Sequence, residues 1–427
     1  MQPLRRFGEL RLLVLVALLL VTGFVAVVAT ELASFAPVQP VVPLLFIALA
    51  VALHLFLVTI GFRGDQLLLP LMLALTAIGL IEVERLASNL LLQQLSWCVV
   101  AAGVFVVAIL VPRDLSVLAR YKYTWALLGI ALLLSPLLPG LGREINGARI
   151  WIGVGFAQFQ PSEAVKVLLV IFFASYLDEY REVLTMKRLG PLPLPPVPYL
   201  LPIILMWGMA MVVMVFEKDL GATLIFFGIF LAMLYLATGQ TSYTLLGALL
   251  LFGGAYLAYR SFGHVAVRVD TWLEPFAGDT RFSSGYQLVQ GLFALGNAGL
   301  LGAGLGGGLP ERIPVVWSDF VFDAFTEETG FLGGAALLAL YLVLVFRGMI
   351  IALRAPTTFL QLLAGGLSFI IAFQTLVIVG GNARLIPLTG VTLPFIAYGG
   401  SSLVANFLIV ALLLRVSDVT ARVRGPA

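Results

Sequence analysis

Long apolar runs, separated by short polar connections, dominate the chain. A run of about 20 apolar residues is long enough to cross a membrane as a helix, and a hydropathy reading predicts about twelve such spans. They cover residues 11–31, 41–62, 66–86, 94–112, 123–140, 161–178, 198–216, 220–238, 243–260, 329–350, 359–380 and 394–416. The pattern therefore predicts an all-α fold, that of a polytopic integral membrane protein.

One segment, residues 261–328, interrupts this pattern with many ionisable side chains and a glycine-rich run at 296–308. Long loops in compact folds are uncommon and are usually functional or disordered. Disorder fits poorly, because aromatic residues such as Trp272, Phe293 and Trp317 give the segment apolar surface to bury. We interpret it as a large extracellular loop and as the working part of the protein, in which the glycine run is either flexible or closely packed.

Composition supports the membrane class and excludes others. Hydrophobic residues make up 61% of the chain and charged residues 11%, whereas soluble domains carry about 25% charged residues. The net charge is +3, but the basic residues are scattered between the spans, so no nucleic-acid partner is expected. The single cysteine, Cys98, lies in an apolar run, which excludes a disulfide framework and a cysteine metal site.

Lysine and arginine placement predicts the orientation, because cytoplasmic loops carry an excess of both. With the N-terminus inside, one side of the membrane collects fifteen of the 25 basic residues. These are Arg5, Arg6, Arg11, Arg63, Arg113, Arg120, Lys122, Arg181, Lys187, Arg188, Arg347, Arg354, Arg415, Arg422 and Arg424. Both termini are therefore expected in the cytoplasm and residues 261–328 outside.

Two ionisable residues near the start of the span at 161–178 attract attention. Glu163 and Lys166 are three residues apart and share one helix face. Glu163 could compensate the helix dipole while Lys166 reaches the interface. Alternatively, the two form a functional pair within the membrane, where ionisable groups usually need a partner. Both interpretations remain open.

Further polar candidates lie at the ends of other spans. Asp219, in Glu217-Lys218-Asp219, belongs either to a solvated turn or to a helix start that it caps. Arg384 and the small-residue run Tyr398-Gly-Gly-Ser401-Ser402 interrupt the last two spans. For this run, close helix packing and ligand contact are equally good interpretations.

Asp319 stands out within the long segment, because Trp317-Ser318 precede it and Phe320-Val-Phe322 follow it. Apolar surroundings raise a carboxylate's affinity for protons, which suits a general base. A second interpretation is that Ser318 or Asp319 caps a helix whose first turns are acidic. Sequence spacing does not separate the two.

Several motifs, taken in order, closely resemble those of the SEDS (shape, elongation, division and sporulation) family over residues 66–417. They are Asn146-Gly147-Ala148-Arg149-x-Trp151, Gln160-Pro161-Ser162-Glu163-x-x-Lys166, Asp219-Leu220-Gly221, Gly285-Tyr286-Gln287, Leu309-Pro310-Glu311, Asp319-Phe320-x-Phe322, Glu327-Glu328-x-Gly330-Phe331, and Pro387-x-Thr389-Gly390-x-x-Leu393-Pro394-Phe395-Ile396-x-Tyr398-Gly399-Gly400-Ser401-Ser402. The ordered set is specific, although no single motif would be.

The resemblance implies an inverting peptidoglycan glycosyltransferase in the bacterial cytoplasmic (inner) membrane. Such proteins polymerise lipid II at the outer face into an undecaprenyl-linked glycan strand during elongation or division, beside a class B penicillin-binding protein that acts as transpeptidase. The family's essential acid falls on Asp319, which would deprotonate the acceptor hydroxyl. Its Glu and Lys pair falls on Glu163 and Lys166.

Charge that develops on the departing pyrophosphate would be offset by cations. The candidates for this and other substrate contacts are Lys166, Glu163, Arg149, Trp151, Asp219, Arg268, Gln287, Arg384, Ser401 and Ser402. No cofactor is certain. A divalent cation (Mg or Mn) could share the task, although the sequence shows no dedicated metal cage.

The chain also departs from the family pattern. The resemblance implies a core of about ten spans, so residues 1–64 are interpreted as an added N-terminal transmembrane hairpin and residues 65–427 as the glycosyltransferase core. Two other functions remain possible. One is a flippase or transporter of lipid-linked precursors, with polar residues along its path, and the other is a non-catalytic cell-wall scaffold.

Overall fold

The computed structural model describes residues 6–31, 41–111, 114–145, 148–154, 157–186, 201, 204–205, 207–209, 211–212, 217 and 219–424. Asn146, Gly147, Lys218 and most of the span predicted at 198–216 lie outside these residues. The chain divides into two compact units. Unit 1 comprises residues 1–109, 270–347 and 374–427, and unit 2 comprises residues 110–269 and 348–373.

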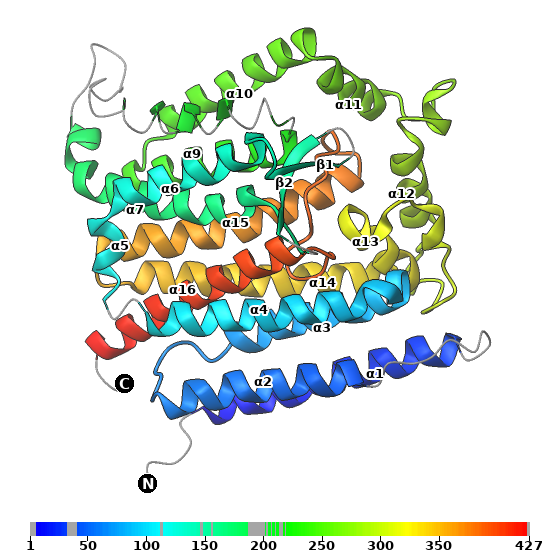
Figure 1. The fold of residues 1–427 in the computed structure, drawn as a ribbon, viewed down its shortest axis with the longest axis horizontal. Coiled ribbons are helices and arrows are strands. Elements are labelled where there is room, and N and C mark those ends of the chain that lie inside the picture. Colours follow the sequence, from blue (N-terminus) through cyan, green and yellow to red (C-terminus); the bar gives the residue numbers. More distant parts are fainter. Residues whose placement is uncertain are drawn as a thin grey trace. The chain divides into compact units, whose positions relative to one another are not determined.

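Unit 1 contains most of the long helices. They are α1 (Phe7–Glu31), α2 (Val41–Thr59), α3 (Leu68–Ala87), α4 (Leu91–Leu110), α12 (Tyr286–Asn297), the short α13 (Val316–Asp319), most of α14 (Val321–Arg354), the end of α15 (Thr358–Asn382) and α16 (Gly400–Arg424). Short 3-10 turns lie at Ser88–Leu90, Thr280–Phe282 and Pro310–Arg312. Helix α1 packs against α2 and α3, and α16 packs against α3 (Figure 1).

Unit 2 is built around α7. Its described helices are α5 (Ser116–Arg120), α6 (Lys122–Leu134), α7 (Pro161–Met186), α9 (Leu220–Thr238), α10 (Thr241–Ser261), the first part of α11 (Gly263–Leu273), the end of α14 and the first part of α15. Helix α7 contacts α5, α6 and α9. A 3-10 turn at Ser135–Leu137 leads into an antiparallel sheet, in the order β1-β2-β3, of β1 (Gly142–Ile145), β2 (Ala148–Val154) and β3 (Ala157–Phe159).

Eight helical stretches in the described part of the chain are long and apolar enough to cross a membrane. They are Phe7–Thr30, Val41–Thr59, Leu68–Leu110, Leu220–Thr238, Thr241–Ser261, Val321–Arg354, Thr358–Asn382 and Gly400–Arg424. The stretch Leu68–Leu110 contains two predicted spans, as α3 and α4. The predicted spans at 123–140 and 161–178 correspond to α6 and α7, so the prediction of a polytopic helical membrane protein is confirmed.

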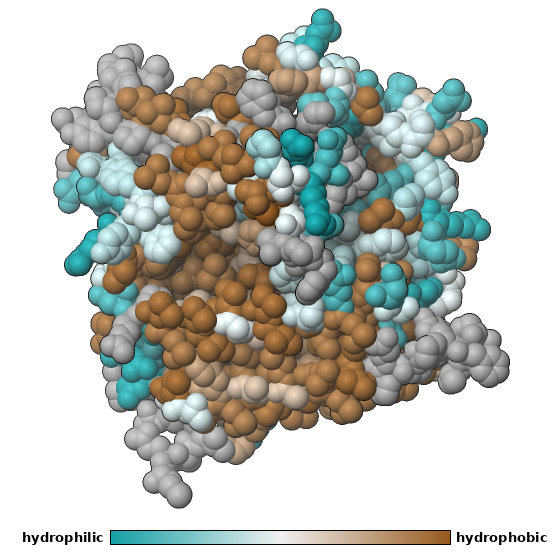
Figure 2. All heavy atoms as spheres, viewed as in Figure 1, coloured by the Kyte–Doolittle hydropathy of each residue, from teal (hydrophilic) through white to brown (hydrophobic). Residues whose placement is uncertain are grey.

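The outer surface of unit 1 is strongly apolar where α2 and α4 face outward (Figure 2). Leu44, Leu55, Val99 and Val107 are among the large apolar side chains exposed there. Exposed apolar patches of this extent mark contact with a membrane or a partner. Together with the lengths of the helices, this surface identifies a face that contacts lipid.

The predicted N-terminal hairpin belongs to unit 1, and its first helix, α1, packs against α2 and α3. Its helices are also joined by buried polar side chains. Glu9 of α1 pairs with Arg6 and accepts a 2.6 Å hydrogen bond from His54 Nδ1 of α2. The boundary between hairpin and core stays a prediction.

Residues 261–328 contain α11, α12, α13 and the first turns of α14. That they form an extracellular loop stays a prediction. Helix α14 begins at Val321, eight residues before the predicted span, and its backbone breaks at Gly330, with φ 75° and ψ −178°. Residues 299–304 fill this break. Ala303 and Gly304 donate N–H bonds to the carbonyls of Glu327 and Glu328 over 2.9 and 3.0 Å. The glycine-rich run is therefore closely packed at Gly302 and Gly308, whereas Gly296, Gly299 and Gly304 lie in open space.

Candidate active site

Asp319 ends the short helix α13, directly before α14. The turn that leads into α13 contains Val315 at φ 52°. A β-branched residue rarely adopts this left-handed conformation, and such strain persists only where surrounding structure enforces it. Strained backbone of this kind clusters at functional sites.

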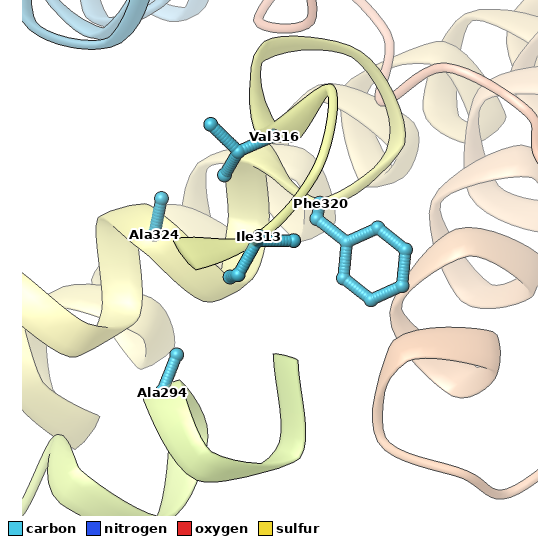
Figure 3. Packing of buried hydrophobic residues seen from close by; sticks show 5 residues of the cluster. All are labelled: Ala294, Ile313, Val316, Phe320 and Ala324. Carbon is cyan, nitrogen blue, oxygen red and sulfur yellow. The ribbon is translucent and has the colours of Figure 1, made fainter. Parts of the chain in front are cut away.

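A small apolar cluster packs around the turn that carries Asp319. It consists of Ala294, Ile313, Val316, Phe320 and Ala324, shown together in Figure 3. Phe320 is fully buried, and Gly291 of α12 lies so close that an added Cβ would be 2.6 Å from its ring. The residue on the C-terminal side of Asp319 is thus fixed in a tightly packed pocket, while Asp319 itself is half-buried.

Hydrogen bonds from three directions fix the same turn. Gln287 Nε2 donates to the Pro314 carbonyl over 2.8 Å and approaches Asp319 Oδ1 at 3.4 Å. Asn382 Nδ2 donates to the Asp319 main-chain carbonyl over 2.9 Å. The Ser318 hydroxyl donates to Asp319 Oδ1 over 2.9 Å. The carboxylate is therefore partly accessible on a rigidly held backbone, which is what a general base needs.

Acidic residues beyond Asp319 are buried in α14. Asp323 is fully buried and accepts a hydrogen bond from Asn382. Glu328 is 3% exposed and pairs with Arg85 of α3 at 2.8 Å. This ion pair joins α3 to the part of α14 where the helix breaks. Glu328 therefore binds a protein side chain and is not solvated.

Arg384 lies in a left-handed conformation, with φ 58°, just after α15. Its guanidinium donates to the carbonyls of Trp272 and Leu273 over 2.9 and 2.5 Å, and its own carbonyl accepts from Trp272 Nε1 over 3.1 Å. Arg384 therefore joins the end of α11 to the turn after α15. Its proposed contact with pyrophosphate stays a prediction.

Ser401 and Ser402 are buried in the first turn of α16. Ser402 Oγ accepts from Thr392 over 2.8 Å and from Asn406 over 3.3 Å. Beside them, a Cβ on Gly400 would overlap the indole ring of Trp97. Of the two interpretations of this small-residue run, the structure favours close helix packing.

A second group of candidates lies together in unit 2. Lys166 Nζ and Glu163 Oε2 are 2.6 Å apart, and both side chains are buried. Gln160, one residue before α7, donates from Nε2 to Asp219 Oδ2 over 3.2 Å. Asp219 Oδ1 accepts from the Ala222 N–H over 2.9 Å, so the interpretation of Asp219 as the N-cap of α9 is confirmed.

Two carboxyl groups just before α9, those of Glu217 and Asp219, bind protons more tightly than usual. Burial raises the pKa of Asp219, and the Glu163 charge adds to this, while the Ala222 N–H and Arg268 act in the opposite direction. Burial, with a smaller contribution from Asp219, raises the pKa of Glu217 to about 8. The charge of Glu163, in the first turn of α7, thus acts on Asp219 at the start of α9.

Arg149 and Trp151 lie on β2 of the same unit. Arg149 is exposed and Trp151 is half-buried, with its backbone paired to that of Arg143 on β1. The structure therefore places Glu163, Lys166, Asp219, Arg268, Arg149 and Trp151 in unit 2, and Asp319, Gln287, Arg384, Ser401 and Ser402 in unit 1.

Sequence reasoning missed Asn382 and Arg85, which both contact acidic candidates. Asn382 lies at the end of an apolar span, in Gly380-Gly-Asn-Ala-Arg384. A buried polar residue in such a place is a functional signal and would have identified it. Within the described residues, no group of three or more His, Cys, Asp or Glu side chains is placed to hold a metal ion.

Comparison with known proteins identifies the family. The FtsW/RodA/SpoVE family model, described as "Cell cycle protein", matches residues 66–422. The peptidoglycan glycosyltransferase RodA of Mycobacterium tuberculosis (strain H37Rv) is 39% identical, over 98% of this chain and 92% of that protein. This alignment spans nearly the whole chain, including the region of the N-terminal hairpin.

Solved structures show the same fold. A chain of a peptidoglycan synthase complex, described for its coordination of polymerization and crosslinking, is 27% identical with a TM-score of 0.67, over 84% of this chain and 98% of that chain. The rod shape determining protein RodA of Thermus thermophilus is 27% identical with a TM-score of 0.56, over 83% and 97%. This chain therefore belongs to the FtsW/RodA/SpoVE family, the SEDS proteins.

Proposed function

We propose that this protein is a peptidoglycan glycosyltransferase that polymerises lipid II at the outer face of the bacterial cytoplasmic membrane. Its family and the names of its relatives support this function. The observation that carries it is the placement of Asp319. A partly accessible carboxylate sits on a strained turn that hydrogen bonds and a packed apolar cluster hold in place.

In the proposed reaction, Asp319 accepts the proton of the GlcNAc 4-hydroxyl of the acceptor lipid II. The hydroxyl oxygen attacks the anomeric carbon of the donor strand, and the bond from that carbon to undecaprenyl pyrophosphate breaks. Attack from the face opposite the leaving group inverts the anomeric configuration. A fixed base contributes most when its carboxylate is already aligned with the hydroxyl.

The departing pyrophosphate needs positive charge nearby. Arg149 is exposed on β2 and is a good candidate for this contact. Lys166 is paired with Glu163, so its charge is already balanced in the described structure. A divalent cation would supply Lewis-acid charge at the pyrophosphate when bound. The described residues do not form a group of ligands for it, so we assign no step to a metal.

We also propose that the protein acts with a class B penicillin-binding protein and that both termini lie in the cytoplasm. The first proposal is supported by the related chain from a complex that couples polymerization with crosslinking. The second is supported by the excess of basic residues on one side of the membrane. Transport of lipid-linked precursors is a second candidate function, favoured by the buried ionisable group around Glu163 and Asp219.

Polymerisation of purified lipid II by the full-length protein, with its transpeptidase, tests the proposal. Asp319→Asn should lower the rate by roughly 10²- to 10⁴-fold, the usual contribution of a general base. Asp279→Asn is the matched control, because it makes the same change at an exposed residue of the same segment, and it should keep wild-type activity. Strands made equally well by Asp319→Asn would exclude the general base. Precursor transport by a wild-type protein that makes no strands would support the second candidate.

A further inference from the structure

We propose that Asn382 is a positioning residue for Asp319 and that Asp323 holds the Asn382 amide in place. The proposal rests on the proposed function, because it concerns the placement of the base in that reaction. Asn382 is the last residue of α15 and is fully buried. Its side chain lies against the turn that carries Asp319, although 63 residues separate the two in sequence.

The side-chain amide of Asn382 donates two hydrogen bonds. Its Nδ2 atom donates to the main-chain carbonyl of Asp319 over 2.9 Å and also to Asp323 Oδ2. A carboxamide nitrogen carries two hydrogens, so both are used. One bond reaches the peptide group of the proposed base, and the other reaches a carboxyl group one helical turn further along the chain.

Asp323 depends on the same contact. It is fully buried, and in the part of the chain that the structure describes its Oδ1 has no hydrogen-bond partner. The amide of Asn382 therefore satisfies one oxygen of this carboxyl group, Oδ2. Because Asn382 Oδ1 also has no hydrogen-bond partner among the described residues, the orientation of its amide depends on its two acceptors.

The backbone that carries Asp319 needs support because its turn includes Val315 in a strained left-handed conformation. Gln287 and the Tyr398 N–H hold the carbonyls of Pro314 and Trp317, whereas Asn382 holds the carbonyl of Asp319 itself.

Asn382 is in turn held by the structure around it. Two residues later, Arg384 closes the end of α15, where its N–H donates to the Gly381 carbonyl over 3.1 Å. The Arg384 guanidinium then binds the end of α11 through Trp272 and Leu273. The side chain that fixes the proposed base thus projects from a turn that is tied to a second segment.

The test compares Asn382→Leu, Asp323→Asn and the wild type as full-length proteins with the transpeptidase, and measures kcat and KM for lipid II together with thermal unfolding. Leucine has the branched shape of asparagine but no donor. Asn382→Leu should lower kcat roughly ten- to a hundredfold, as misplaced catalytic groups do, with KM within about twofold. Asp323→Asn replaces one of the two carboxyl oxygens with an NH2 group and so weakens the hold on the Asn382 amide; its kcat should also fall, but by less than that of Asn382→Leu.

Each outcome decides the question. If Asn382→Leu does not fold, Asn382→Ala replaces it with the same expectation. Either folded variant with a wild-type kcat, even with a lowered melting temperature, would show that Asn382 only stabilises the fold. An Asp323→Asn protein with the wild-type kcat would show that Asp323 does not hold the amide in place. A wild-type protein that makes no strands would instead overturn the proposed function.

Discussion

Substitutions in the Glu163–Lys166 pair can separate its contribution to stability from its contribution to activity. The two groups are 2.6 Å apart, with Lys166 2% and Glu163 8% exposed. Lys166→Met removes the cation and leaves the Glu163 carboxylate buried without its partner. Breaking a buried ion pair from one side costs about 3–5 kcal/mol. We expect the upper part of this range, because the Glu163 charge already acts unfavourably on Asp219.

The double variant Glu163→Gln/Lys166→Met removes both charges while keeping the size of the side chains. Replacement of a whole buried pair is often neutral or stabilising, so thermal unfolding in detergent should show most of the lost stability restored. If the pair also contacts substrate, lipid II polymerisation by the double variant should stay low. Stability that recovers without activity would therefore assign the pair a functional role.

Arg422→Met provides the control, because Arg422 is half-exposed and the buried Asp418 keeps the Arg63 N–H and Arg415 as partners. It should therefore cost clearly less than Lys166→Met, about 1 kcal/mol. Two results would refute the reasoning. Lys166→Met with unchanged stability would contradict the burial of the pair. A double variant that recovers both stability and polymerisation would show that the pair serves only the fold.

Two further predictions concern the backbone and pH. Gly330→Ala should cost at least about 3 kcal/mol in thermal unfolding, because φ 75° with ψ −178° suits glycine alone and an added Cβ would lie 2.5 Å from the Leu300 carbonyl. Gly103→Ala, at an open helical position of α4, should be neutral or stabilising, and an equal loss there would contradict the argument. Glu217 has a pKa raised to about 8 by burial, so the folded state binds its proton more tightly than the unfolded state. Its contribution to stability is complete below about pH 4.5 and is lost as the pH rises to about 8, by at most about 1.4 kcal/mol per pH unit. Glu217→Gln should flatten the dependence of the melting temperature on pH over this window, and an unchanged slope would assign the dependence to another group.

Hydropathy predicted most spans because lipid requires apolar side chains around a helix and satisfies no backbone polar group. It placed the start of the last span incorrectly, at residue 394, whereas α16 begins at Gly400. Phe395 adopts a left-handed φ of 67°, and its carbonyl lies 2.8 Å from the position of a Cβ on Gly79 of α3. This apolar stretch is buried by protein in a non-helical form. Hydropathy alone does not distinguish such a stretch from a helix.

Local spacing predicted some parts of the site for an equally simple reason. Glu163 and Lys166 meet because residues three apart share a helix face. Asp219 caps α9 because its carboxylate accepts from the N–H of Ala222, only three residues later in the sequence. The small sheet at Gly142–Phe159 was missed, because its strands are short and lie in a polar connection. The helices within 261–328 were missed because their apolar faces alternate with many charges.

Local spacing could not predict the environment of Asp319, because the residues that hold it are distant in sequence and bind the backbone of its turn. Asn382, Tyr398 and Gln287 all donate to main-chain carbonyls of the turn. Every residue has a carbonyl, so the acceptor leaves no mark in the sequence, and only Asn382 and Gln287 donate through a recognisable side chain, because Tyr398 donates its backbone N–H. A motif can therefore identify the base, while the residues that fix its position become visible only when the chain folds. For this reason the substitutions that best test the site include Asn382, which no motif contains, as well as Asp319.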